Sequence, residues 1–125
     1  MARKISVLGL MLLLAGIALA AREGKSVKLT GYIIDNACSG RANGENGAEK
    51  VKNHTVKCAQ MPNCAKSGYA LFTENKLYKL DDSGNAKAAE ILKSTKLEKG
   101  LQVEIEGTLD GETLKVNSIK EVAGS

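Results

Sequence analysis

The sequence predicts a mainly β fold, a small five-stranded barrel with one helix between strands three and four and a long Cys/His-rich loop after strand one. Two observations predict it. Five short stretches carry the β-branched, alternating pattern of strands, and a stretch between the third and the fourth carries apolar residues at helical spacing. All three cysteines and the only histidine lie in one polar segment between the first two strands.

The first residues have the pattern of a bacterial export signal. Arg3 and Lys4 precede an unbroken apolar stretch over residues 5–20, which ends in Ala-Leu-Ala, the form that signal peptidase reads. The stretch is shorter than the ~20 residues that a membrane-spanning helix needs, which disfavours the alternative of an uncleaved anchor. We therefore expect a cleaved signal peptide over residues 1–21.

Cleavage would leave one domain, residues 22–125, in the periplasm or outside the cell, with no remaining membrane attachment. The whole chain has 18 basic and 14 acidic residues and a net charge of +4. Loss of Arg3 and Lys4 lowers this charge to about +2. The remaining charges are interleaved and aromatic residues are few, so we expect no nucleic-acid partner.

The first three predicted strands take up two regions of the chain. Residues 27–35 alternate, with Val27 and Ile33 on one face and Ile34 on the other, which predicts strand one. Residues 69–73 and 76–80 then read as a hairpin around a two-residue Glu-Asn turn. The polar, glycine-containing segment between these regions, residues 36–67, is predicted to be a long irregular loop.

The last third of the chain predicts a helix and two strands. Residues 81–85 read as a turn, Asn85 as the cap of a helix with apolar residues at helical spacing, and Gly100 as its end. Alternation over residues 101–106 indicates strand four, followed by a type I′ turn signal at Asp110-Gly111. Strand five then alternates until a slip that predicts a bulge near Asn117-Ser118.

The order strand, long loop, strand, strand, helix, strand, strand is that of an OB-fold, a small Greek-key barrel. The long loop would then be one of the two loops with which OB-folds bind ligands, although this analogy names no ligand. A simple meander with one packed helix fits the same pattern.

The spacing C-x15-H-x3-C-x5-C in the loop suggests a metal site. Thiolates and an imidazole suit a tetrahedral zinc ion, and soft sulfur ligands also suit copper. The predicted ligands are Cys38, His54, Cys58 and Cys64, with Asp35 three residues before the first of them. Strand one would hold Cys38, and the other ligands would fold the loop around the ion.

Two alternatives remain open at this point. Exported cysteines usually form disulfides, so Cys64 bonded to Cys38 or to Cys58 would make a stapled structural or protein-interaction module without metal. A cysteine thiol activated by His54 is also conceivable, since Cys58 follows His54 by four residues and would share a helical face with it. No other catalytic motif accompanies this pair, so no catalytic residue is assigned. The residues favour a binding protein over an enzyme, and they name no protein or small-molecule partner and no oligomeric state.

Three blocks give the chain its resemblance to a family of small exported bacterial proteins of uncharacterised function with an OB-like fold. They are GYIIDNAC, HTVKCAQMPNCAKSGY and VEIEGTLDG, at residues 31–38, 54–69 and 103–111. The recurring D-x-x-C, histidine and cysteine pair of that family correspond to Asp35, Cys38, His54, Cys58 and Cys64. The resemblance implies export, an OB-like fold and grouped Cys/His residues, and it implies no activity.

Overall fold

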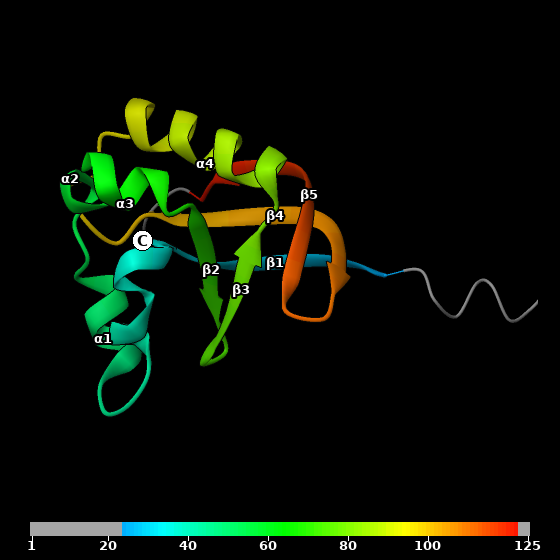
Figure 1. Cartoon of the computed structure of the whole chain (residues 1–125), viewed down its shortest axis with the longest axis horizontal. Coiled ribbons are helices and arrows are strands. Elements are labelled where there is room, and N and C mark those ends of the chain that lie inside the picture. The colour runs from blue at the N-terminus through cyan, green and yellow to red at the C-terminus, as the bar shows by residue number, and fades with distance from the viewer. Residues whose placement is uncertain (1–23, 123–125) are drawn as a thin grey trace, which may run out of the picture.

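Five strands are hydrogen-bonded in a closed ring in the computed structural model, which describes residues 24–122 (Figure 1). They are β1 (Lys25–Asp35), β2 (Tyr69–Thr73), β3 (Lys76–Leu80), β4 (Gln102–Asp110) and β5 (Thr113–Glu121). The ring order is β1-β2-β3-β5-β4, and only β3 and β5 pair in parallel. The mainly β fold is confirmed, and this order differs from that of a meander. The expected signal peptide lies outside the described residues.

Strand β1 is shared by both sides of the ring. Its first part, Lys25 to Tyr32, pairs with β4, and its last part, Tyr32 to Asp35, pairs with β2. The change of partner requires a close backbone approach, because a Cβ at Gly31 would lie 2.3 Å from the Phe72 carbonyl oxygen. Only glycine fits there, and the strand can then deliver Asp35 to the end of the ring.

The bulge predicted in strand five is confirmed. Glu106 pairs with Ser118 and Gly107 pairs with Val116, so Asn117 has no partner on β4. A Cβ at Gly107 would lie 2.1 Å from the Lys115 carbonyl oxygen, so the tight contact beside the bulge also depends on glycine.

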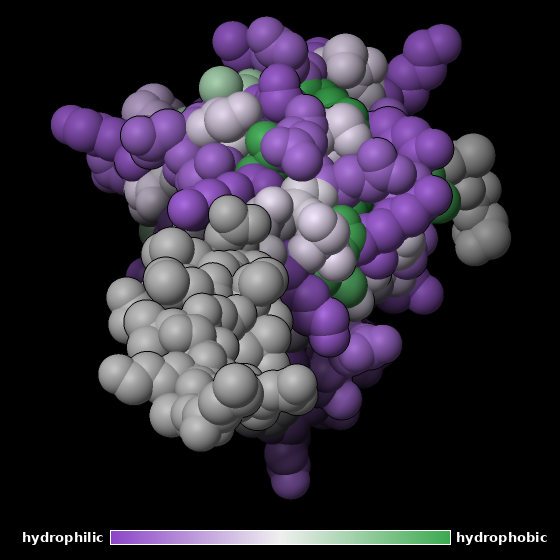
Figure 2. All heavy atoms as spheres, turned by 90° about the vertical axis from the view of Figure 1, so that its right-hand side faces the viewer, coloured by the Kyte–Doolittle hydropathy of each residue, from purple (hydrophilic) through white to green (hydrophobic). Residues whose placement is uncertain are grey.

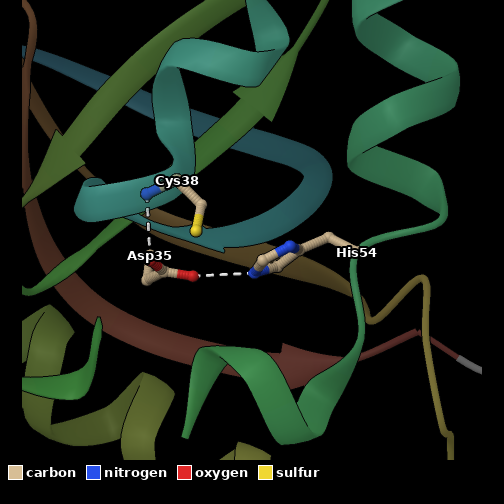
Figure 3. Close-up of side chains that lie close together, drawn as sticks. All are labelled: Asp35, Cys38 and His54. Atoms are coloured by element: carbon tan, nitrogen blue, oxygen red, sulfur yellow. Dashed lines mark hydrogen bonds and ion pairs between the residues drawn. The ribbon is translucent and has the colours of Figure 1, made fainter. Parts of the chain in front are cut away.

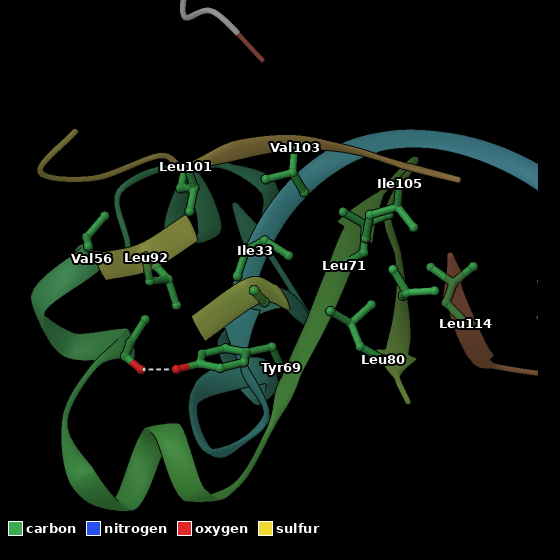
Figure 4. Packing of buried hydrophobic residues seen from close by; sticks show 13 residues of the cluster. Ile33, Val56, Tyr69, Leu71, Leu80, Leu92, Leu101, Val103, Ile105 and Leu114 are labelled. Carbon is green, nitrogen blue, oxygen red and sulfur yellow. Dashed lines mark hydrogen bonds between the residues drawn. The ribbon is translucent and has the colours of Figure 1, made fainter. Parts of the chain in front are cut away.

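Buried side chains form two clusters on opposite faces of β1. The main cluster fills the ring, with Ile33 and Leu71 at its centre, and helical residues such as Val56 and Leu92 close it (Figure 4). The second cluster contains Ile34 and Phe72 on the other face. The predicted division of strand one into two faces is thus confirmed, and both faces are buried toward its C-terminal end, at Ile33 and Ile34.

The two hairpin turns differ in how well the sequence predicts them. Between β2 and β3, Glu74 and Asn75 have φ values of 49° and 62°, as a type I′ turn requires. Between β4 and β5, Asp110 pairs with Thr113 and belongs to the strand. The turn residues are therefore Gly111 and Glu112, one position later than predicted.

Helix α4 (Asp82–Ser94) lies between β3 and β4, as predicted, but its ends differ from the prediction. It begins at Asp82, because the Asp81 carboxylate accepts the Gly84 amide at 2.9 Å and acts as the cap. Asn85 lies inside the helix and accepts the Tyr69 amide instead. The helix ends at Ser94, before Gly100 is reached.

The segment predicted as an irregular loop is mostly helical. It contains η2 (Asn36–Ala42), α1 (Gly47–Lys52), α2 (Val56–Ala59) and α3 (Pro62–Lys66). These helices are too short to show a clear helical period in the sequence. Ala42 and Val51 pack in the second cluster, and Val56 and Ala59 pack in the main one, so this inserted segment is part of the core.

The side of the molecule away from α1, α2 and α3 carries mainly hydrophilic side chains, with only small separate apolar spots (Figure 2). Over residues 24–122, no helix combines the length and the apolar character that crossing a membrane requires.

We predict that Asp81→Ala lowers the free energy of unfolding by about 1–2 kcal/mol, the usual loss for a helix cap. Asp81 Oδ1 also accepts the Val116 amide at 3.1 Å, so the substitution removes a link between α4 and β5 as well. Asp81→Asn keeps an acceptor and is expected to lose less, and exposed Asp82→Ala serves as the control. Urea denaturation measures all three, and equal losses for the variants would contradict this account of the cap.

Candidate metal centre

Asp35 is the last residue of β1, and its side chain is fully buried. Its Oδ2 accepts the Cys38 amide at 3.0 Å, which makes Asp35 the cap of η2, and its Oδ1 lies 2.7 Å from Nε2 of His54 (Figure 3). A buried carboxylate is costly unless it is hydrogen-bonded or paired. Both oxygens of Asp35 have such partners, and each partner comes from the inserted segment.

His54 lies between α1 and α2, and its side chain is 4% exposed. The backbone amide of His54 donates to the Val51 carbonyl in α1. Two residues later, the amide of Val56 donates to the Glu98 carbonyl. Thr55 forms an isolated β-bridge with Lys99, just before β4. The backbone on either side of His54 is therefore held to the body of the domain, which fixes the ring opposite Asp35.

Cys38 completes a compact group of three potential ligands. One atom each from Asp35, Cys38 and His54 lie within 4.8 Å of one another, and the Cys38 sulfur is near the His54 ring and the Asp35 carboxylate in Figure 3. The group offers an oxygen, a sulfur and a nitrogen, the three ligand types that zinc accepts from proteins. Of the four ligands predicted from the sequence, Cys38 and His54 belong to it.

Cys58 and Cys64, the other two predicted ligands, lie outside this group, in α2 and α3. Burial raises the pKa of the Cys64 thiol, and the negative charge of Asp35 and hydrogen bonding to it add to this effect. The three thiols are free, with no disulfide between them.

Ser67 holds Cys64 next to the group. Its hydroxyl accepts the Ala37 amide at 3.0 Å and lies 2.6 Å from the Cys64 carbonyl, to which it donates. The Asn36 amide also donates to the Gly68 carbonyl at 2.8 Å. The end of α3, which carries Cys64, is thus tied to the start of η2, which carries Cys38.

Burial raises the pKa of the Cys38 thiol to about 11, helped by the charge of Asp35 and hydrogen bonding to it. A thiol with such a pKa is protonated at neutral pH and is a poor nucleophile. This raised pKa disfavours a catalytic role for the Cys38 thiol itself, whereas the sequence pairs His54 with Cys58 in the thiol-enzyme alternative. A bound cation would reverse the effect, because a coordinating thiol loses its proton.

Asp35 is the group member that the sequence reasoning did not include among the ligands. The sequence contains a signal for it: Asp35 directly follows an apolar strand and precedes a cysteine by three residues. An acid next to a polar segment is usually a surface residue, so this pattern alone does not predict a ligand. Only the fold shows that this one is buried.

The comparisons with known proteins add no family: no family model, curated protein or solved structure matches the chain.

We predict that iodoacetamide alkylates Cys38 at pH 7.5 about a hundredfold more slowly in the folded, metal-free protein than in urea. The reason is the rise of its pKa from 9.0 to about 11, which lowers the thiolate fraction by that factor. Peptide mass mapping of a time course measures the rate at each cysteine. Removal of the carboxylate charge by Asp35→Asn should speed the Cys38 reaction, and a Cys38 that reacts faster than in urea would revive the thiol-enzyme alternative.

Proposed function

We propose that this protein is a small exported metal-binding protein that holds one zinc ion through Asp35, Cys38 and His54, with Cys64 as the fourth ligand. The observation that carries the proposal is the burial of the group. Asp35 and His54 are the two buried polar or charged residues within residues 24–122, and both face the same thiol. Polar groups that are buried together at one point are a feature of functional sites.

The donor set favours zinc over copper. Cys38 and Cys64 alone would suit Cu(I), but the carboxylate of Asp35 is a harder ligand that Cu(I) does not prefer. Zinc binds carboxylate, imidazole and thiolate in one tetrahedral site. The replacement of Cys58 by Asp35 in the predicted ligand set therefore shifts the proposed ion toward zinc.

Small movements would open the site for the ion. Two tetrahedral zinc ligands at about 2.0–2.1 Å from the metal lie about 3.3 Å from each other. Asp35 Oδ1 and His54 Nε2 are 2.7 Å apart, so they would separate by about 0.6 Å as zinc replaces the proton between them. Asp35 is the last residue of β1 and His54 lies in the connection between α1 and α2, so such a shift does not disturb the middle of a strand or helix.

Three features support the wider description. The strand order β1-β2-β3-β5-β4, with α4 between β3 and β4, supports an OB-like barrel, and the site then lies in the segment after the first strand. The basic-apolar-small pattern of residues 1–21 supports export. The resemblance to the family of small exported proteins supports the grouping of Asp35 with the Cys/His residues.

A second candidate function, a disulfide-stapled interaction module, is favoured by one observation. Ser67 ties the end of α3, which carries Cys64, to the start of η2, which carries Cys38, so oxidation in an oxidising compartment would join these two thiols and leave Cys58 free. Thiol counting on the exported protein separates the candidates, because this one leaves one free thiol and the zinc site leaves three.

We predict that the reduced protein binds one zinc ion, measured by native mass spectrometry and by competition with a chromophoric chelator. Cys38→Ser and His54→Gln should each weaken binding at least a hundredfold, since each removes a direct ligand. Cys64→Ser removes the fourth ligand and should weaken binding as well. Cys58→Ser is the matched control and should bind as tightly as the parent. Loss of zinc in Cys58→Ser alone would instead support the ligand set Cys38, His54, Cys58 and Cys64.

We predict that Asp35→Asn and Asp35→Ala separate the role of the carboxylate in folding from its role in zinc binding. Asp35→Ala leaves the Cys38 amide and the His54 ring without an acceptor and should cost about 3 kcal/mol of unfolding free energy. Asp35→Asn keeps an acceptor and should lose less stability but most of the zinc affinity. Thermal unfolding with and without zinc measures both effects. Zinc stabilisation that persists in Asp35→Asn would remove Asp35 from the site.

A further inference from the structure

A polar hollow of about 650 Å³ lies against the outer side of His54. It is bounded by the last turn of η2, by α1 and by the start of α2, all within the inserted segment. Its lining residues are polar or charged apart from Cys58, and the carbon atoms of their side chains form part of its surface. A few polar groups placed on such a surface fix the orientation of a small polar ligand.

Two free cations lie at this hollow. Arg41 and Lys50 both line it and are exposed, and neither forms an ion pair with any residue between 24 and 122. Glu49 is the one acid among the lining residues. The lining therefore carries an excess of positive charge, and its two cations are not neutralised by the protein itself.

Neutral hydrogen-bond donors line the same hollow. Thr55 Oγ1 accepts the Cys58 amide at 3.1 Å, which leaves its hydroxyl hydrogen free to donate. Asn46 occupies the cap position of α1 but makes no side-chain capping bond, so its amide group is free as well. His54 adds no donor, because its ring donates from Nε2 to Asp35 and Nδ1 of the neutral ring is an acceptor.

We propose that this hollow binds a small organic anion, with its carboxylate or phosphate group held by Arg41 and Lys50. An excess of cations together with neutral donors is the chemistry that recognises these groups. The volume exceeds that of an inorganic ion and lies within the range of small-molecule sites. The site goes beyond the proposed function and does not need zinc, although His54 would place the anion next to a bound ion.

The test is a titration of the folded, reduced protein with succinate and with glycerol 3-phosphate, followed by NMR of backbone amides. It is done on zinc-free and zinc-loaded protein. Saturable shifts are expected at Asn53 and Thr55, which line the hollow. Arg41→Gln and Lys50→Gln should each raise the dissociation constant about tenfold, the effect of one charge-assisted hydrogen bond. Lys96→Gln is the matched control, because Lys96 is exposed, lies outside the hollow and should leave binding unchanged.

The outcomes separate this proposal from the zinc proposal. Tighter binding of succinate identifies the ligand as a carboxylate, and tighter binding of glycerol 3-phosphate identifies it as a phosphate. Anion binding without any zinc binding would overturn the zinc site and leave the anion site intact. No saturable shift with either probe, in either metal state, would overturn the anion site. Binding that is the same in Arg41→Gln and Lys50→Gln as in the parent would also overturn the anion site, because the anion would then lie elsewhere.

Discussion

The buried carboxylate of Asp35 is the interaction on which the rest of the structure depends. It accepts the amide that starts η2, and it lies opposite the imidazole that sits between α1 and α2. Through these two bonds the end of a barrel strand organises both halves of the inserted segment. A hydrophobic side chain at position 35 would satisfy neither donor, so the fold of the segment and the chemistry of the site share one cause.

The inserted segment combines two kinds of attachment. Apolar residues on η2 and α1 pack in the second cluster beside Phe72, and the Tyr69 hydroxyl donates to the Ala59 carbonyl at 3.0 Å to hold α2. Between these anchors lie the three thiols and the hollow beside His54. The three thiols are thus carried by short helices whose positions are set by contacts with the ring of strands. Such a site is more precise than one on a free loop.

The strands could be predicted from the sequence because each has its own period and its own turn signals. β1 alternates between two faces, and Glu74-Asn75 and Asn117 mark a turn and a bulge without any knowledge of the fold. The inserted helices could not be predicted in this way, since helices of four to seven residues are stabilised by their contacts rather than by a pattern. Asn85 illustrates the same limit, because its choice between capping a helix and accepting the Tyr69 amide is made by tertiary structure.

The site was predictable in part for the same reason. The crowding of Cys38 and His54 into one polar segment is visible in the sequence, but the selection of Asp35 over Cys58 as their neighbour depends on where β1 ends. That end is set by the passage of β1 from β4 to β2 at Gly31. The first and fourth strands lie far apart in the sequence, and pairings between distant parts of a chain form slowly during folding. A chain that has not yet closed its ring therefore carries separate thiols and a solvated carboxylate, and the site exists only in the fully folded molecule.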